Sequence, residues 1–332
     1  MRSKRAALLI FMILALFARS YAQDVVYSQF YANPVYLNPA LAGSKLCQRI
    51  TLNYRNQWPG IDQGYVSYSA SWDQDFDKIS GAVGVIVNSD VAGGGVYNRF
   101  SGSGIYSYRL QASRYIILNA ALQAGYVQYR LDGNKLVFGD QIDIRTGNLQ
   151  PTQDHLPPRL NAGNVDFSAG LLGGYKESVY FGVAVNHLSR PDISFYEGGS
   201  NRMQMRWTVH SGILIDMSHG RDEAEVGSFS ISPNIVFVQQ GKFQQINAGM
   251  AVNMFPFVAG LWLRHGIANP DAVITLLGFQ QKNYKLEYSF DYTISRLTVK
   301  SSGAHEISVA WLFNKASDSK RFHRMRLSNS EF

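Results

Sequence analysis

The chain lacks the features that stabilise most exported soluble domains or build helical membrane proteins. Its 332 residues include one cysteine, Cys47, so no disulfide can form within the chain. Only one long apolar run is present, Ala6–Ala18, close to the start. These absences exclude a small disulfide-stapled fold and a bundle of transmembrane helices. If a chain of this size is exported, it needs another source of stability, such as a sheet closed on itself.

The first residues are typical of a secretory signal peptide. The basic residues Arg2, Lys4 and Arg5 precede the apolar run, and Ser20 and Ala22 place small residues at the −3 and −1 positions of a cleavage site. We therefore predict cleavage after Ala22 and exclude residues 1–22 from the fold. An uncleaved anchor helix would need about 20 apolar residues. No cysteine directly follows the cleavage site, which argues against a lipoprotein.

Most of the positive charge of the chain belongs to this leader. Its removal takes away four basic and no acidic residues, so the formal charge falls from +7 to +3. The high isoelectric point thus gives no indication of nucleic-acid binding. A second basic segment is residues 314–332, with a local charge of +3. This tail is either a solvated end or a contact for a periplasmic partner.

Apolar and polar residues alternate through most of the mature chain. Residues 283–295 give the clearest example, with the apolar set Tyr284, Leu286, Tyr288, Phe290, Tyr292 and Ile294 against the polar set Lys285, Glu287, Ser289, Asp291 and Thr293. A period of two residues places the two sets on opposite faces of one strand. Three charges on one face are costly in a packed soluble core, but they suit the wet lumen of a membrane barrel.

This alternation predicts an all-β fold, a transmembrane antiparallel β-barrel of about 14 strands. The expected strands are 49–58, 64–73, 79–88, 97–110, 114–130, 163–176, 178–187, 202–217, 227–239, 242–254, 256–265, 271–281, 283–295 and 303–313. The domains are then a signal peptide (1–22), a periplasmic or lumenal segment before the first strand (23–48), the barrel (49–313) and the basic periplasmic tail (314–332).

The connections between these strands alternate in length. If both chain ends lie in the periplasm, the two longest connections, 131–162 and 188–201, face the outside of the cell. Most connections on the other side, such as 111–113, are very short, and 217–227 is the exception. Long outer loops and short periplasmic turns are typical of outer-membrane barrels.

Catalytic and ligand-binding patterns are weak. His210, Ser211 and Asp216 share a predicted strand, but Ser211 points away from His210, so the three form no triad. His305 and Glu306 are adjacent in a strand and cannot bind one ion together. Gly93–Gly95 precedes no helix and is typical of a flexible loop rather than a phosphate cradle. We predict no enzyme activity, no metal and no cofactor.

Charged side chains are expected to face the lumen, namely Arg55, Arg99, Arg109, Arg206, Lys285, Glu287, Asp291 and Glu306. They permit two interpretations. One is a solute-selective pore, and the other is a lumen closed by its own side chains and by residues 23–48. A barrel of about 14 strands is narrower than the porins of about 16–18 strands that leave a water channel, which favours the closed lumen.

Several segments resemble one known family. They contain Ser28, Gln29, Phe30, Asn33, Pro34, Asn38, Pro39 and Gly43, then Asn53, Tyr54, Arg55, Gln57 and Trp58, then His187, Ser189 and Pro191, then residues 288–292, and finally Gly303, His305 and Glu306. Together they resemble the PorP/SprF family of outer-membrane proteins of type IX secretion and gliding motility. The part before the first strand is expected at the periplasmic entrance or in the lumen, and in that strand Asn53 and Arg55 are expected to point inward.

The resemblance implies a non-catalytic protein of the Gram-negative outer membrane. Such a protein supports the export and surface anchoring of a secreted partner that carries a type IX sorting domain, such as a gliding adhesin. The resemblance also implies contacts with other secretion components, including a periplasmic ring or lipoprotein, besides outer-membrane lipid. We expect the outer loops 131–162 and 188–201 to hold the cargo. The alternative function is a passive or solute-selective outer-membrane pore.

Overall fold

The structure is a computed structural model. It describes residues 23–61, 64–143, 145–147, 149–176, 178–218, 228–266, 269–294 and 302–313. The predicted leader, 1–22, and the predicted basic tail, 314–332, lie outside the described residues.

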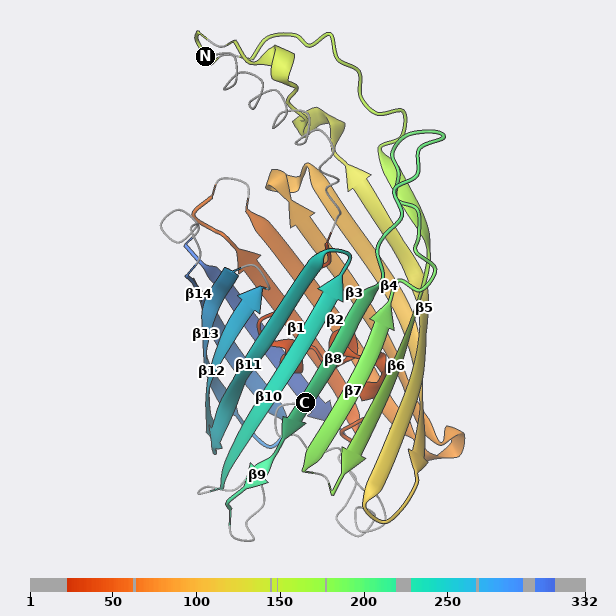
Figure 1. The fold of residues 1–332 in the computed structure, drawn as a ribbon, viewed down its shortest axis with the longest axis vertical. Helices are drawn as coiled ribbons and strands as arrows, with labels where there is room; N and C mark the ends of the chain where they lie inside the picture. The colour runs from red at the N-terminus through yellow and green to blue at the C-terminus, as the bar shows by residue number, and fades with distance from the viewer. Residues whose placement is uncertain are drawn as a thin grey trace, which may run out of the picture.

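An antiparallel sheet closes on itself to form a barrel (Figure 1). Its strands are β1 (Gln48–Gln57), β2 (Tyr65–Phe76), β3 (Gly81–Ala92), β4 (Tyr97–Gln111), β5 (Ile116–Leu131), β6 (Asn161–Tyr175), β7 (Val179–Asn186), β8 (Arg206–Ile213), β9 (Ile215–Asp216), β10 (Phe229–Gln240), β11 (Phe243–Met254), β12 (Phe257–Gly266), β13 (Asn269–Gln280), β14 (Tyr284–Thr293) and β15 (Ala304–Phe313). β8 and β9 both pair with β10 and count as one strand. The pairing of β1 with β15 closes the barrel, and the predicted 14-stranded barrel is confirmed.

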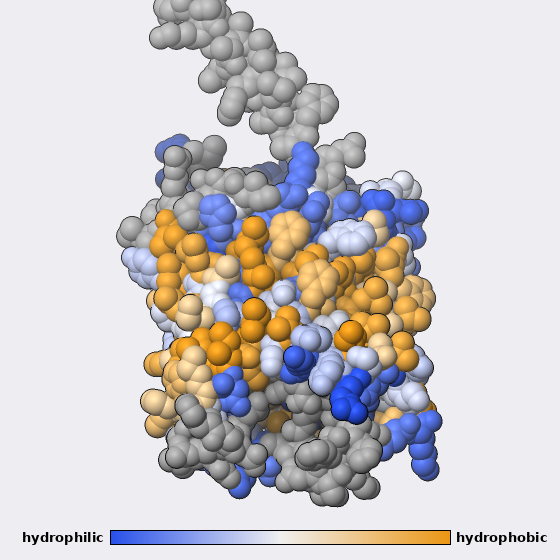
Figure 2. Space-filling view, turned by 60° about the horizontal axis from the view of Figure 1, so that its bottom comes forward, coloured by the Kyte–Doolittle hydropathy of each residue, from blue (hydrophilic) through white to orange (hydrophobic). Residues whose placement is uncertain are grey.

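The outer surface of the barrel is apolar around its middle. Large side chains such as Leu52, Tyr126 and Leu277 are exposed there, and Figure 2 shows an apolar band between more polar zones. This band matches the lipid-facing belt of barrels that span the outer membrane. Among the described residues, no helix has the length and apolar character needed to cross a bilayer.

The inner surface is polar and shielded from solvent. All the charged side chains predicted to face the lumen lie on this side: Arg55, Arg99, Arg206, Glu287, Asp291 and Glu306 are buried, and Arg109 and Lys285 are half-buried. In β1, Asn53 and Arg55 are buried whereas Leu52 is exposed, as the alternation predicts.

The predicted strand 202–217 is too long. β8 begins at Arg206 and is interrupted at Leu214, whose N–H donates to the carbonyl of Ser178 (2.6 Å). Met203 falls within the predicted strand but is buried against Tyr129. Its N–H donates to the carbonyl of Pro191 (3.0 Å), because this connection folds back onto its own apolar cluster instead of extending the strand.

The two ends of the barrel differ (Figure 1). The loop end carries the connections 132–160, between β5 and β6, and 187–205, between β7 and β8. The turn end carries short connections such as 112–115, between β4 and β5. The predicted alternation of long and short connections is therefore present, although most of the longer turn expected at 217–227 lies outside the described part of the chain.

Residues 23–47, which we call the plug, fill the lumen and are nearly all buried (Figure 1). They contain three short helical turns, η1 (Phe30–Ala32), α2 (Pro34–Leu37) and η2 (Pro39–Leu41). Pro34 and Pro39 begin two of these turns, where a missing N–H is no loss. The side chain of Asn38 accepts the N–H of Ala40 (2.9 Å). Asn-Pro thus starts a helical turn at both places.

Candidate functional site: the plug and the lumen wall

Many of the buried charges in the described part of the chain gather where the plug meets the wall of the barrel. We treat this interface as the candidate site. It has three levels, from the loop end, where the plug begins, to the turn end, where it joins β1.

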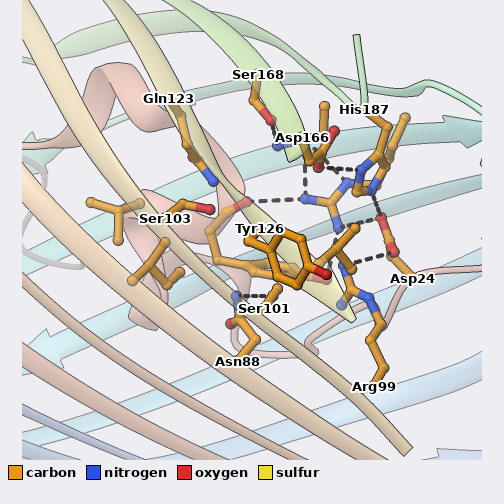
Figure 3. Close-up of a pocket in the computed structure, with 16 residues that line it drawn as sticks. Asp24, Asn88, Arg99, Ser101, Ser103, Gln123, Tyr126, Asp166, Ser168 and His187 are labelled. Atoms are coloured by element: carbon orange, nitrogen blue, oxygen red, sulfur yellow. Dashed lines mark hydrogen bonds and ion pairs between the residues drawn. The ribbon is translucent and has the colours of Figure 1, made fainter. Parts of the chain in front are cut away.

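At the loop end, cationic groups of the wall surround the carboxylate of Asp24 (Figure 3). Its Oδ1 lies 3.3 Å from Nη2 of Arg99. Its Oδ2 lies 2.6 Å from Nε2 of His187 and 3.7 Å from Nη1 of Arg206. The N–H of Asp24 donates to Oε1 of Gln240 (2.8 Å). The side chain of Asp24 is only 3% exposed, so its charge is well shielded from solvent.

His187 joins the plug to the wall. Its second nitrogen, Nδ1, lies 2.6 Å from Oδ2 of Asp166 on β6. An imidazole that donates through both nitrogens is positively charged. Burial disfavours that charge, but Asp24 and Asp166 outweigh it and raise the pKa of His187. Burial likewise opposes ionisation of Asp24, yet His187 and Arg99 hold the pKa of its carboxyl well below its ordinary value.

Slightly further along the plug, Glu306 of β15 binds the main chain of the plug. Its two carboxylate oxygens accept the N–H groups of Ser28 (2.8 Å) and Gln29 (3.0 Å). Arg55 of β1 donates to the same carboxylate at 3.0 Å. This contact therefore joins the first strand, the last strand and the plug.

Asp291 of β14 extends the same network. Its Oδ2 accepts from Arg55 (2.9 Å), Arg264 (2.7 Å) and the hydroxyl of Ser28 (2.6 Å). Both arginines and the carboxylate are buried. Removing one member of such a network leaves an uncompensated buried charge, which is strongly destabilising.

The middle level of the interface is held by amide and aromatic contacts. Nδ2 of Asn38 donates to the carbonyl of Leu171 (3.1 Å) and lies 3.0 Å from Nε2 of His210. Tyr31 stacks on Trp262 of β12, with ring centroids 5.4 Å apart. On β6, Gly170 leaves room for the plug, because a Cβ there would collide with Oδ1 of Asn38.

At the turn end, the last part of the plug is bound through its main chain. The N–H of Gly43 donates to Oδ2 of Asp73 (2.7 Å), and its carbonyl accepts from Arg109 (2.6 Å). Arg49 donates to the same aspartate at 2.9 Å. Gly43 has a φ of +70°, a conformation that favours glycine.

Little space remains between plug and wall at the cavities found in this interface. A polar cavity of ≈ 30 Å³ adjoins Asp24, Arg99 and His187 (Figure 3), and an apolar one of ≈ 30 Å³ adjoins Val25 and Phe30. Since a water molecule needs about 10–15 Å³ by this measure, each cavity has the volume of roughly two waters. Neither is large enough to conduct a solute.

The structure brings together most residues that carry the family resemblance. Within the plug lie Ser28, Gln29, Phe30, Asn33, Pro34, Asn38, Pro39 and Gly43, all buried. His187 and Glu306 bind this segment from the wall. Of the β1 residues, Arg55 contacts the plug, Asn53 is buried in the lumen wall, and Tyr54, on the outer face, packs its ring 5.3 Å from that of Tyr68.

The other residues of the resemblance lie apart from this interface. Gln57 and Trp58 are at the loop end of β1, Ser189 and Pro191 are in the connection 187–205, and Gly303 precedes β15. His305 faces outward and lies 2.7 Å from the hydroxyl of Tyr288. Its neighbour Glu306 faces inward, so the expectation of opposite faces is correct.

Sequence reasoning missed several members of the site. Arg49 and Asp73 lie at lumen-facing positions of β1 and β2, where alternation carried further would have found them. Arg264 and Trp262 likewise belong to the inward set of β12. Asp24 had no such signal, because it precedes the first strand and its partners are more than 60 residues away.

The residues considered for catalysis have structural partners. His210 is buried beside Asn38, whereas the hydroxyl of Ser211 donates to the carbonyl of Tyr180 (2.8 Å). Gly93–Gly95 forms a short turn, η4, between β3 and β4. Over the described ranges, no group of three or more His, Cys, Asp or Glu residues could hold a metal ion.

Comparisons with known proteins agree with this architecture. A family model described as type IX secretion system membrane protein PorP/SprF matches residues 19–311. The P. putida toluene transporter TodX has a similar structure, with a TM-score of 0.51, 10% identity, and coverage of 83% of this chain and 93% of TodX. For the outer membrane protein Omp33 of Acinetobacter baumannii the TM-score is 0.44, with 8% identity and coverage of 81% and 100%. Comparison with curated proteins returned no match. The likeness to TodX shows the barrel fold alone.

Proposed function

Because the chain belongs to the PorP/SprF family of type IX secretion system membrane proteins and forms an outer-membrane β-barrel, we propose that it is a closed, non-catalytic partner in secretion. In this role it supports the export and surface anchoring of a secreted protein with a type IX sorting domain, such as a gliding adhesin. Membership of the family supports this type of partner, and the closed lumen supports a role that does not depend on flow through the barrel.

The filled lumen is the single observation that carries the proposal. The plug is bound at the loop end through Asp24, near Glu306 through two main-chain N–H groups, and at the turn end through Gly43. A barrel closed in this way acts through its outward-facing surfaces, which are the connections at its two ends and the lipid-facing belt.

The loop end offers a surface for a protein partner. In the connection 132–160, the apolar side chains Val137, Ile142, Leu149 and Leu156 are 45–65% exposed. Two described parts of the connection are nevertheless held together, because Asp140 accepts hydrogen bonds from the hydroxyl of Thr152 (2.8 Å) and from the N–H of Gln153 (2.8 Å). Apolar side chains held outward on an ordered loop suit protein docking. We assign this loop to the cargo.

The opposite end is assigned to the periplasm. There, the short turns and the predicted basic tail, 314–332, would meet ring or lipoprotein components of the secretion system. The net positive charge of the tail suits an acidic partner surface.

A solute pore is the second candidate function. It is favoured by the polar cavity beside Asp24. For this function the plug would have to leave the lumen, since its present position leaves no conducting space at the two cavities described above.

The secretion role is tested by deleting the gene and comparing culture-medium and cell-surface proteins. We expect at least one protein with a sorting domain to lose export or attachment. The deletion strain is then complemented with a variant in which Val137, Ile142, Leu149 and Leu156 are all changed to serine. This variant should return the barrel to the outer membrane but should not restore attachment of the secreted protein. The control Asp154→Asn with His155→Gln, exposed in the same loop, should restore both. Unchanged export and attachment after the deletion would refute the role.

A further inference from the structure

We propose that Arg99, His187 and Arg206 form a carboxylate-binding site at the loop end of the lumen. Asp24 occupies the site from within, and an acidic segment of a partner polypeptide occupies it when the first residues of the plug withdraw. The site itself is independent of the proposed secretion role. Only the identity of the incoming polypeptide rests on that role.

The charges of the wall favour an anionic occupant. Three basic side chains meet here, whereas the wall supplies two carboxylates, Asp90 at 3.0 Å from Arg99 and Asp166 at 2.6 Å from His187. Asp24 supplies a third carboxylate, which lies within 3.7 Å of all three basic groups. With His187 protonated between Asp24 and Asp166, the three cations and the three carboxylates balance. Withdrawal of Asp24 leaves either a buried positive charge without this partner or a neutral imidazole.

Wall residues orient the site without help from Asp24. Arg206 donates to Oδ1 of Asn186 from two of its nitrogens (3.2 and 3.3 Å). Arg99 is fixed by Asp90, and His187 by Asp166, which also accepts from Ser189 (3.3 Å). A site held by its own supporting contacts is ready to receive another carboxylate of the same geometry.

The neighbouring contacts favour a peptide over a small carboxylate. Oε1 of Gln240 accepts the N–H of Asp24, and Glu306 accepts the N–H groups of Ser28 and Gln29. Every peptide has such N–H groups except at proline. The wall therefore recognises one acidic side chain and, a few residues later, two adjacent main-chain donors.

The site is reached from the loop end. His187 opens the connection 187–205, and Arg206 is the first residue of β8. Gln23 is exposed although Asp24 beside it is buried. Residues 24–29 contain no strand and at most a bend before η1. They can thus exchange while α2 and η2 keep their contacts.

The site is tested in the purified full-length protein by Asp24→Ala, with thermal unfolding followed in sodium acetate and in sodium chloride of equal ionic strength. We expect a lowered midpoint that acetate, and not chloride, restores in large part. The matched control is Asp75→Ala, which breaks the Asp75–Arg109 pair at the turn end and should gain nothing from acetate. Equal effects of both salts on Asp24→Ala would overturn the site.

The source of the carboxylate is tested with a hexapeptide that has the sequence of residues 24–29. It should stabilise the Asp24→Ala variant at concentrations at least about tenfold lower than acetate, since it adds the main-chain contacts. Its analogue with Asp24→Asn should not. A peptide no better than acetate would overturn the preference for a polypeptide and leave a small-carboxylate site.

If Asp24→Ala does not fold, the exchange is measured in a protein that keeps Asp24. A spin label is attached at Gln23→Cys, with the unsubstituted protein, whose Cys47 is buried, as the labelling control. Excess hexapeptide should increase the mobility of the label, and the Asp24→Asn analogue should not. Unchanged mobility would overturn the exchange. None of these results depends on cargo export, so failure of the site and failure of the secretion role are distinguishable.

Discussion

At the scale of single residues, burial decides how much a charge contributes. Glu306 is buried with Arg55 and accepts two main-chain N–H groups from the plug. Glu197 also pairs with an arginine, Arg159, but the two side chains are 70% and 57% exposed. Exposed pairs are screened by water, whereas a buried partner left alone keeps its full desolvation cost.

We therefore predict different costs for the same chemical change at these two positions. Glu306→Gln should lower the free energy of unfolding by about 3–5 kcal/mol, because Arg55 loses one of its two carboxylate partners. Glu197→Gln should change it by less than about 1 kcal/mol. Urea unfolding from lipid vesicles measures both values. Similar costs for the two variants would contradict this account of the network.

Alternation in the sequence is enough to place Arg55 and Glu306 inside the barrel. It does not pair them, because their contact depends on the register in which β1 meets β15, with Arg55 opposite Glu306. That register is set by closure of the whole sheet. The role of Asp24 is still harder to predict from the sequence, since its partners come from β4, β8 and the connection between β7 and β8.

At the scale of elements, the start of the plug is held by the contact of Asp24 with His187, and both of these groups titrate. Burial and the carboxylates act in opposite directions on His187, and its pKa is raised from 6.5. Its contribution is fully present below pH 6.5 and is lost as pH rises through the raised pKa. The pKa of Asp24 is lowered from 3.8. Its contribution to stability is therefore present above pH 3.8 and is lost as pH falls through the lowered pKa. Around His187 the other charged groups are Asp166, Arg99 and Arg206.

The start of the plug should accordingly become more mobile in alkaline solution. A spin label at Gln23→Cys reports this directly, and its mobility should rise as pH increases above the ordinary pKa of His187. In a His187→Gln background, which cannot ionise, the label should be mobile already and show no such rise. An alkaline rise that persists in that background would assign the transition to another group.

The elements themselves were predictable to different degrees. Period-two alternation located the strands because each has one lipid-facing and one lumenal side. The strand 202–217 was overextended, since Met203 belongs to an apolar cluster that only the folded connection creates. The helical turns of the plug escaped prediction, because segments this short depend on tertiary contacts such as that of Asn38 with His210 rather than on local periodicity.

At the scale of the whole molecule, the plug turns an open barrel into a closed one. Strand number and facing follow from the sequence, whereas the state of the lumen depends on where residues 23–47 lie. Their contacts with β1, β2, β4, β6, β8, β12 and β15 involve much of the circumference. We infer that the protein acts through its two ends.

Single-channel recording in planar bilayers tests this central claim most directly. The complete mature protein should show little steady conductance, because the plug fills the lumen. A variant without residues 23–47 should show large, stable steps if its barrel still folds. Large stable steps from the complete protein would contradict the account and establish the pore function instead.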